Sequence, residues 1–218
     1  MSIRVMVVDN HGIVREGLCL LINQQDDMEV VGQAFDGREA VELAVKLQPD
    51  VVVMEVCIPG LNGVDATRQI LKKSTHTKVL ALSAHSDKQF VSDMLKAGAS
   101  GYVLKNGSSN ELLDAIRIVD KGERYLSSKI AGIVINDYVN GNGAGVNDLS
   151  VNRLTGKERE LLQLLVEGRV AKVAAKILHV SVKTVDARRR DIMNKLGVSS
   201  LSQLTKFALR EGITTLEF

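Results

Sequence analysis

Polar side chains follow several apolar runs of this 218-residue sequence, each at the point where the run ends. Asp9 and Asn10 follow one run, Glu55 follows a second, Ser83 closes a third and Lys105 follows a fourth. A carboxylate at the mouth of a buried strand is costly unless chemistry or a cation requires it. Two converging carboxylates need a divalent cation or an ammonium, and a hydroxyl can donate to an incoming oxyanion. The set therefore predicts a pocket that holds a cation and meets an oxyanion, although each residue alone is equally consistent with a solvated strand end.

Residues 182–196 carry the second pattern with chemical meaning, a basic amphipathic helix. Its apolar stripe, predicted to be core, consists of Val182, Val185, Ile192, Met193 and Leu196. The residues predicted to face base edges in a major groove are Lys183, Asp186, Ala187 and Arg190. The residues predicted to contact phosphates are Thr184, Arg188, Arg189 and Lys195. A merely solvated basic face is the alternative interpretation.

The elements that must position the pocket alternate between strand and helix over residues 1–122. Short valine-rich runs at 4–8, 29–34, 51–56, 78–82 and 101–104 are typical of strands covered on both faces. The amphipathic segments between them lie at 11–24, 37–48, 64–73, 88–97 and 109–121. Five such units predict a doubly wound α/β fold with a five-stranded parallel sheet of flavodoxin-like type, whose ligands bind at the carboxyl ends of the strands.

The remaining residues change character. Residues 123–152 contain a helical pattern at 127–138 and a run of Asn and Gly at 140–145, and predict an interdomain linker. Residues 153–218 show only helical patterns, including a short helix, a tight turn at His179 and the longer basic helix. This spacing predicts an all-α four-helix domain with a helix-turn-helix.

Charge separates the two parts of the chain. Residues 153–218 carry 13 Lys and Arg against 7 Asp and Glu, a net charge of +6, whereas residues 1–152 carry 15 against 19, a net charge of −4; together they give +2. Only the second part is therefore expected to meet a polyanion. Cys19 and Cys57 are predicted to be free thiols in a reducing cytoplasm, and the sequence shows no zinc-ligand cluster, signal peptide or membrane span.

Short motifs in both parts carry a resemblance to a known family. The first part contains Val7-Val8-Asp9-Asn10-His11, Met54-Glu55-Val56-Cys57-Ile58-Pro59-Gly60, Leu82-Ser83-Ala84 and Gly101-Tyr102-Val103-Leu104-Lys105, which resemble receiver-domain motifs of bacterial response regulators. The second contains Leu154-Thr155-Gly156-Lys157-Glu158-Arg159-Glu160 and Ser181-Val182-Lys183-Thr184-Val185-Asp186, which resemble LuxR-type domains. Over nearly the whole chain, the sequence resembles the NarL/FixJ family of two-component response regulators.

The resemblance implies a role for each pocket residue. In that family an aspartate at the position of Glu55 accepts a phosphoryl group from a histidine kinase, with Mg²⁺ bound by a preceding acidic pair. By this resemblance Ser83 senses the phosphoryl group, Tyr102 repositions with it and Lys105 forms a salt bridge to it. The implied Mg²⁺ ligands are Asp9, Asn10, Glu55 and the backbone carbonyl of Cys57.

Two departures from the family pattern affect this pocket. Glu55 stands where an aspartate is expected, and its carboxylate reaches further by about 1.5 Å, roughly one bond length. Asn10 stands where a second acid is expected, which removes a charge from the metal site. We therefore expect weak Mg²⁺ binding and little or no phosphorylation, with Glu55 reaching toward Ser83 and Lys105 as a partial substitute for phospho-aspartate.

The resemblance also implies a homodimer that reads an inverted repeat in double-stranded DNA. The dimer contact would include Leu201, Leu204, Phe207 and Ala208, unless these residues only pack the last helix onto its own domain. We expect a cytoplasmic DNA-binding transcription regulator with a degenerate receiver, phosphorylation-independent or partly constitutive, and not an enzyme. Its rivals are a phosphorylation-dependent regulator with a glutamate at the acceptor position, an interaction protein with vestigial DNA binding, and a small α/β phosphatase or nucleotide enzyme using Glu55 and Asp9.

Overall fold

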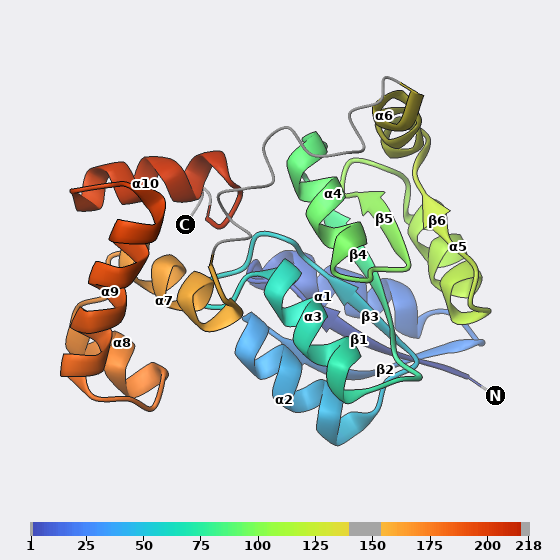
Figure 1. Cartoon of the computed structure of the whole chain (residues 1–218). Coiled ribbons are helices and arrows are strands. Elements are labelled where there is room, and N and C mark those ends of the chain that lie inside the picture. The colour runs from blue at the N-terminus through green and yellow to red at the C-terminus, as the bar shows by residue number, and fades with distance from the viewer. Residues whose placement is uncertain (1, 140–153, 215–218) are drawn as a thin grey trace. The chain divides into compact units, whose positions relative to one another are not determined.

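The chain was analysed as a computed structural model, which describes residues 2–139 and 154–214. It divides into two compact units, residues 1–140 and 141–218, whose structures are described separately. The first is a parallel sheet with helices on both faces, and the second is a group of four helices (Figure 1).

The first unit is built on a parallel sheet with the strand order β2-β1-β3-β4-β5-β6. Its strands are β1 (Ile3–Val8), β2 (Met28–Ala34), β3 (Val51–Met54), β4 (Lys78–Ser83), β5 (Gly101–Leu104) and β6 (Tyr125–Leu126). The order of the first five is that of the flavodoxin-like doubly wound fold, as the sequence predicted. The predicted number of strands was one too few, because β6 adds a sixth by pairing with β5.

Helices cover both faces of this sheet and create two hydrophobic cores. On one face lie α2 (Gly37–Leu47), α3 (Gly63–Lys73) and α4 (Lys88–Lys96); on the other lie α1 (Gly12–Asn23) and α5 (Ser109–Asp120). The valines of β3 contribute to both cores, Val52 to the first and Val51 and Val53 to the second. Burial on both faces explains why the strands read as continuous apolar runs rather than as alternating patterns.

The loop after β3 is shaped by a close backbone approach. Gly63 begins α3, and a Cβ atom at this position would lie 2.2 Å from the carbonyl oxygen of Glu55. The Gly63 N–H donates to the carbonyl of Val56 at 2.9 Å. Asn62 caps the same helix by accepting from the N–H of Asp65. Only glycine leaves room for this packing, so α3 is fixed directly against the segment that carries Glu55.

Residues 123–139, predicted to be linker, instead pack with the first unit. β6 pairs with β5 in the register Tyr102 to Leu126, and α6 (Ser128–Val139) lies on α4. Ile130 of α6 is fully buried in the core beneath α4. The helical pattern at 127–138 was predicted, but its apolar side was not recognised as a surface for packing. The rest of the predicted linker, residues 140–152, lies outside the described residues, and the domain boundaries stay a prediction.

The second unit has its own hydrophobic core. Its helices are α7 (Gly156–Val166), α8 (Ala171–Ile177), α9 (Val182–Leu196) and α10 (Leu201–Arg210), with α8 and α9 forming the predicted helix-turn-helix. Thr155 and Glu158 form a capping box at the start of α7. His179 occupies the left-handed region at φ 53° in the turn, which His tolerates better than most residues. Ser200 caps α10 by accepting from the N–H of Gln203.

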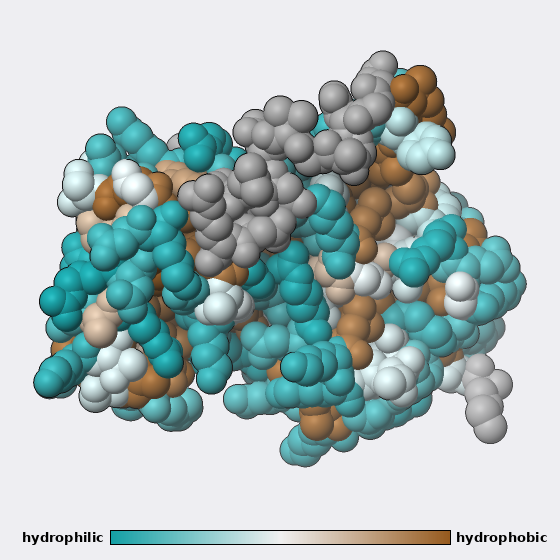
Figure 2. All heavy atoms as spheres, viewed as in Figure 1, coloured by the Kyte–Doolittle hydropathy of each residue, from teal (hydrophilic) through white to brown (hydrophobic). Residues whose placement is uncertain are grey.

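Exposed apolar side chains are scattered over several helices. In Figure 2, hydrophobic atoms gather where α6 lies in Figure 1, in agreement with the exposure of Ile135 and Val139. Within residues 2–139 and 154–214, no helix combines the length and apolar character that crossing a membrane requires.

Candidate functional site

Glu55 lies just past the end of β3 and is 4% exposed. Its Oε1 accepts hydrogen bonds from the backbone N–H of Val56 at 2.6 Å, the N–H of Cys57 at 3.1 Å and the Ser83 hydroxyl at 2.9 Å. Its Oε2 lies 2.5 Å from Lys105 Nζ. Both carboxylate oxygens are therefore engaged by donors, which compensates for the loss of water around a buried polar group.

Lys105 joins the two carboxylates of the pocket. Its Nζ lies 2.6 Å from Asp9 Oδ2 in addition to its contact with Glu55, and Asp9 is 1% exposed. Burial lowers the pKa of the Lys105 ammonium, but Glu55 and Asp9 outweigh it, so the pKa is raised overall. The ammonium that the sequence predicted as one way to relieve repulsion between carboxylates is thus in place.

Ser83 and Tyr102 are connected through the loop after β4. The Ser83 hydroxyl donates to Glu55 and accepts from the backbone N–H of His85 at 3.3 Å. The Tyr102 side chain is fully buried, and its hydroxyl donates to the His85 carbonyl at 2.8 Å. Burial raises the pKa of Tyr102, so this hydroxyl stays protonated as a donor. A movement of Ser83 would therefore also move the loop after β4, which is hydrogen-bonded to Tyr102 through His85.

The predicted metal ligands do not form a cation site in this arrangement. Asp9 and Glu55 direct carboxylate oxygens at Lys105, and Cys57 contributes its N–H to Glu55. Asn10 Oδ1 is buried, and no hydrogen-bond partner for it is found among the described residues. No group of three or more His, Cys, Asp or Glu side chains placed to hold a metal ion occurs in the described part of the chain. Asn10 offers one oxygen ligand, but the two acidic ligands already bind an internal cation, so the residues do not fit Mg²⁺ as they stand.

Two histidines that the sequence gave no role contact the pocket. His11 donates its backbone N–H to Asp9 Oδ1 at 2.9 Å, and its ring Nδ1 lies 3.1 Å from the same oxygen. His85 supports Ser83 and Tyr102 through its backbone. Each histidine follows a pocket residue by two positions, which is the only sequence signal that could have indicated them.

The second candidate site is the exposed side of α9. The side chains of Lys183, Asp186 and Arg190 are exposed, as predicted for a groove-facing surface, while Ala187, Arg188 and Arg189 are partly buried. An open hollow of about 540 Å³ runs along this side and is lined by Lys183, Asp186, Arg189, Arg190 and Met193. The predicted apolar stripe is buried at Val185 and Ile192, but Val182 is 42% exposed because it lies in the first turn of α9.

Two predicted phosphate contacts have partners within the protein. Lys195 Nζ lies 2.7 Å from Glu158 Oε1 and 2.9 Å from Oε2, so its charge is compensated by the capping box of α7. The Thr184 hydroxyl lies 2.8 Å from the hydroxyl of Ser181, the N-cap of α9. These contacts fix the start and the end of α9 and leave Arg188 and Arg189 as the better candidates for binding phosphate.

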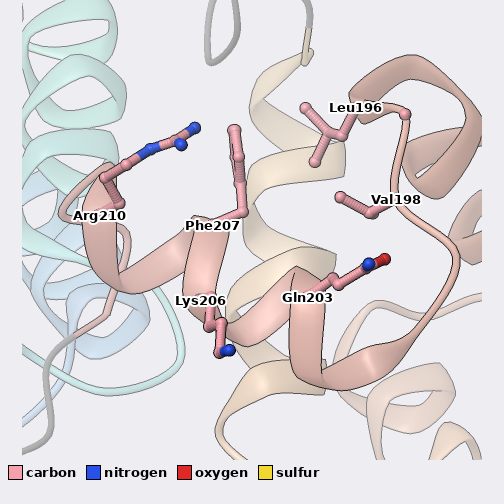
Figure 3. Close-up of a pocket in the computed structure, with 7 residues that line it drawn as sticks. Leu196, Val198, Gln203, Lys206, Phe207 and Arg210 are labelled. Carbon is pink, nitrogen blue, oxygen red and sulfur yellow. The ribbon is translucent and has the colours of Figure 1, made fainter.

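The predicted dimer contact on α10 is buried within its own unit for the most part. Leu204 and Ala208 are fully buried and Phe207 is 7% exposed, so the alternative of packing onto the same domain holds for these three residues. Leu201 alone of the four is exposed, at 43%. Phe207 lines an open groove of about 450 Å³ together with Leu196, Val198, Lys206 and Arg210. Figure 3 shows these side chains, with Phe207 and Arg210 on α10 and Leu196 and Val198 across from Phe207. The Arg210 guanidinium lies 5.5 Å from the centre of the Phe207 ring.

Comparison with known families identifies both units. Residues 5–117 match the response regulator receiver domain, and residues 152–208 match the bacterial regulatory proteins of the luxR family. The fold and the pocket therefore define a response regulator with a receiver domain and a DNA-binding domain.

Two similar proteins align with nearly the whole chain. The oxygen regulatory protein NreC of Staphylococcus carnosus (strain TM300) is 37% identical over 95% of this chain and 97% of its own length. The transcriptional regulatory protein LiaR of Bacillus subtilis (strain 168) is 39% identical over 95% of this chain and 97% of its own length.

Solved structures of response regulators are also similar to this chain. A LuxR-family two-component response regulator from Aurantimonas sp. SI85-9A1 is 37% identical over 64% of this chain and 99% of its own, with a TM-score of 0.61. The response regulator RcsB of Salmonella typhimurium is 25% identical over 94% of this chain and 97% of its own, with a TM-score of 0.59. The chain belongs to the NarL/FixJ family of two-component response regulators, which are DNA-binding transcriptional regulators and not enzymes.

Proposed function

We propose that this regulator binds an inverted-repeat operator as a homodimer and that Glu55, rather than a phosphoryl group, holds its receiver in the signalling arrangement. The observation that supports the proposal is the position of the Glu55 carboxylate, which accepts from Ser83 and pairs with Lys105. These are the two side chains that the family resemblance assigns to the phosphoryl group. The proposed site of action is the cytoplasm.

The extra methylene of glutamate accounts for these contacts. A glutamate carboxylate lies further from the backbone than an aspartate carboxylate by about 1.5 Å, roughly the length of one covalent bond. Glu55 would thus place its oxygens about one bond beyond those of an aspartate, part of the way to the phosphoryl oxygens of an aspartyl phosphate, which lie two bonds beyond. It supplies one negative charge, against about 1.5–2 for a phosphoryl group at neutral pH, so the substitution is partial.

The same contacts oppose phosphorylation. Oε1 accepts three hydrogen bonds and Oε2 contacts an ammonium, so an attacking oxygen would have to give up one of these partners. Near-attack geometry is sensitive to displacements of about 1 Å. We therefore infer that phosphoryl transfer to Glu55, from a histidine kinase or from a small donor, is slow or absent.

DNA binding by the intact chain tests the proposal. Operator sites would be selected from a random pool, and affinities measured by fluorescence anisotropy at fixed salt, with and without Mg²⁺ and acetyl phosphate. The affinity of the wild type for DNA should not change when the phosphoryl donor is added, because the Glu55 carboxylate already contacts Ser83 and Lys105. Glu55→Gln keeps the size but removes the charge and should weaken binding by roughly 5- to 150-fold, the usual range of coupling between two sites. Glu42→Gln on the exposed side of α2 is the matched control and should bind like the wild type.

A phosphorylation-dependent regulator is the second candidate, favoured by the presence of Ser83, Tyr102 and Lys105 in the pocket. In that case acetyl phosphate should strengthen binding by the wild type, and Glu55→Asp should restore Mg²⁺-dependent phosphorylation visible as a mass increase. Either a donor response or a stable phosphorylated wild type would contradict our proposal. Failure of both the intact chain and residues 153–218 to bind any selected site would instead indicate an interaction protein.

A further inference from the structure

The two acidic side chains of the receiver pocket already share a cation that belongs to the chain. Lys105 Nζ lies 2.6 Å from Asp9 Oδ2 and 2.5 Å from Glu55 Oε2, and the lysine side chain is 18% exposed. A divalent ion would need these two oxygens among its ligands, since hard cations require several oxygens and favour carboxylates. The ammonium and the ion would therefore compete for the same place.

The remaining ligand atoms make the competition unequal. Asp9 Oδ1 accepts from the backbone of His11, and Glu55 Oε1 accepts from three donors, so neither is free to turn toward an ion without losing those bonds. Asn10 supplies a neutral oxygen instead of a third carboxylate. The ammonium between the two carboxylates leaves a divalent ion little electrostatic gain against the cost of its dehydration.

We propose that the Lys105 ammonium is the resident cation of this pocket, and that divalent-ion binding is latent and appears only when that charge is removed. Without Lys105, two buried carboxylates would face one another across the space that the ammonium fills. Asn10, next to Asp9 in the sequence, carries a buried Oδ1 for which no hydrogen-bond partner is found among the described residues. Converging carboxylates repel one another unless a cation lies between them. An Mn²⁺ or Mg²⁺ ion has the charge and the preference for oxygen ligands that are needed to take the place of the ammonium. The inference rests on the pocket geometry and not on the DNA-binding output.

Mn²⁺ binding to the intact protein tests this inference, with free Mn²⁺ measured by electron paramagnetic resonance. The wild type should show no saturable site at millimolar metal. Lys105→Gln should gain one saturable site, with an affinity at least about 10- to 100-fold above the limit that millimolar metal sets for the wild type, the size of effect that changes around metal ligands commonly have. Lys105→Arg retains the charge and should stay without a site. Adding Asp9→Asn to Lys105→Gln should abolish the gained site, which separates it from adventitious surface binding.

A second measurement covers the case in which the glutamine variant does not fold. The ¹⁵N ammonium signal of Lys105 in the wild type should be observable, because the group is paired and largely buried, and Mg²⁺ should leave it unchanged. Saturable Mn²⁺ binding by the wild type, displacement of the ammonium signal by Mg²⁺, or a folded Lys105→Gln variant without a site would each overturn the inference. These readouts do not involve DNA, so their failure is distinguishable from failure of the proposed function.

Discussion

One methylene group decides how the pocket at the end of β3 is organised. The length of Glu55 lets its carboxylate reach Ser83 and Lys105 at the same time, as the sequence led us to expect. The sequence did not predict the two backbone donors, Val56 and Cys57, that hold Oε1. The turn after β3 sets the direction of these two N–H groups. That turn packs closely against Gly63, which lies outside the motif that contains Glu55, so the motif alone could not indicate it.

Alkaline pH should weaken the first unit. Burial raises the pKa of Tyr102, and the pKa of Lys105 is raised because Glu55 and Asp9 outweigh the effect of burial. A group whose pKa is raised in the folded state stabilises fully below its unfolded pKa, and that stability is lost as the pH rises through its folded pKa. The melting temperature should therefore begin to fall above about pH 10, the unfolded value of both groups.

Near-ultraviolet circular dichroism at a series of pH values checks this expectation. Tyr102→Phe removes one of the two groups, so its melting temperature should fall less steeply above pH 10 than that of the wild type. Tyr138→Phe is the matched control, because Tyr138 is 84% exposed. A parallel decline in all three proteins would show that other groups dominate alkaline unfolding.

Arg190 and Lys195 should differ in their effects on DNA recognition. The Arg190 side chain is exposed on α9 and can make a bidentate contact to guanine, so Arg190→Ala should relax the preference at one base pair by about 1–3 kcal/mol. Lys195→Ala should change affinity much less, because this ammonium is held by Glu158. Selection from a random pool, followed by binding at fixed salt, measures both. An equal loss of affinity in the two variants would contradict the assignment.

Among the elements, α6 is the one whose role the sequence concealed. Its helical pattern is visible, but it precedes a run of Asn and Gly typical of a linker, and a two-residue strand such as β6 is too short to give a periodic signal. Pairing with β5 and burial of Ile130 are tertiary effects that override this local appearance. By contrast, the five long strands and the helix-turn-helix could be predicted because their apolar spacing is set by burial along the whole element.

Truncation of Ile130 should destabilise the first unit as much as truncation of other core residues does, although Ile130 lies outside the predicted receiver. Ile130→Ala should lower the free energy of unfolding by about 2–5 kcal/mol, since the side chain is fully buried. Ile135→Ala on the same helix is the matched control and should change it by less than about 0.5 kcal/mol, because Ile135 is 60% exposed. Urea unfolding measures both, and equal values would mean that α6 does not pack as described.

At the scale of the whole molecule, the two units have separate hydrophobic cores, and the two parts of the sequence that contain them have opposite net charge. Residues 1–152 carry −4 and residues 153–218 carry +6. This asymmetry predicted correctly which unit contains the DNA-binding domain. The dimer contact was less predictable, because apolar positions on α10 serve both the internal core and any external surface, and periodicity does not distinguish the two.

Separate cores should give two unfolding transitions in calorimetry. Ser83→Ala removes a hydrogen bond to the charged Glu55 and should destabilise only the first unit, by about 1.5–3 kcal/mol. Leu161→Ala removes a fully buried side chain and should destabilise only the second, by about 2–5 kcal/mol. A single transition that shifts equally in both variants would show that the units unfold together.

The carboxylate that contacts Ser83 and Lys105 is covalently part of the chain, and this determines how long its contacts can last. An aspartyl phosphate is lost by hydrolysis, so a regulator that depends on it can be silenced within the lifetime of the molecule. Glu55 cannot be removed in this way. If it sets the state of the receiver, as we propose, loss of a phosphoryl group cannot switch this regulator off, and the rates at which the protein is synthesised and degraded become a means of controlling it.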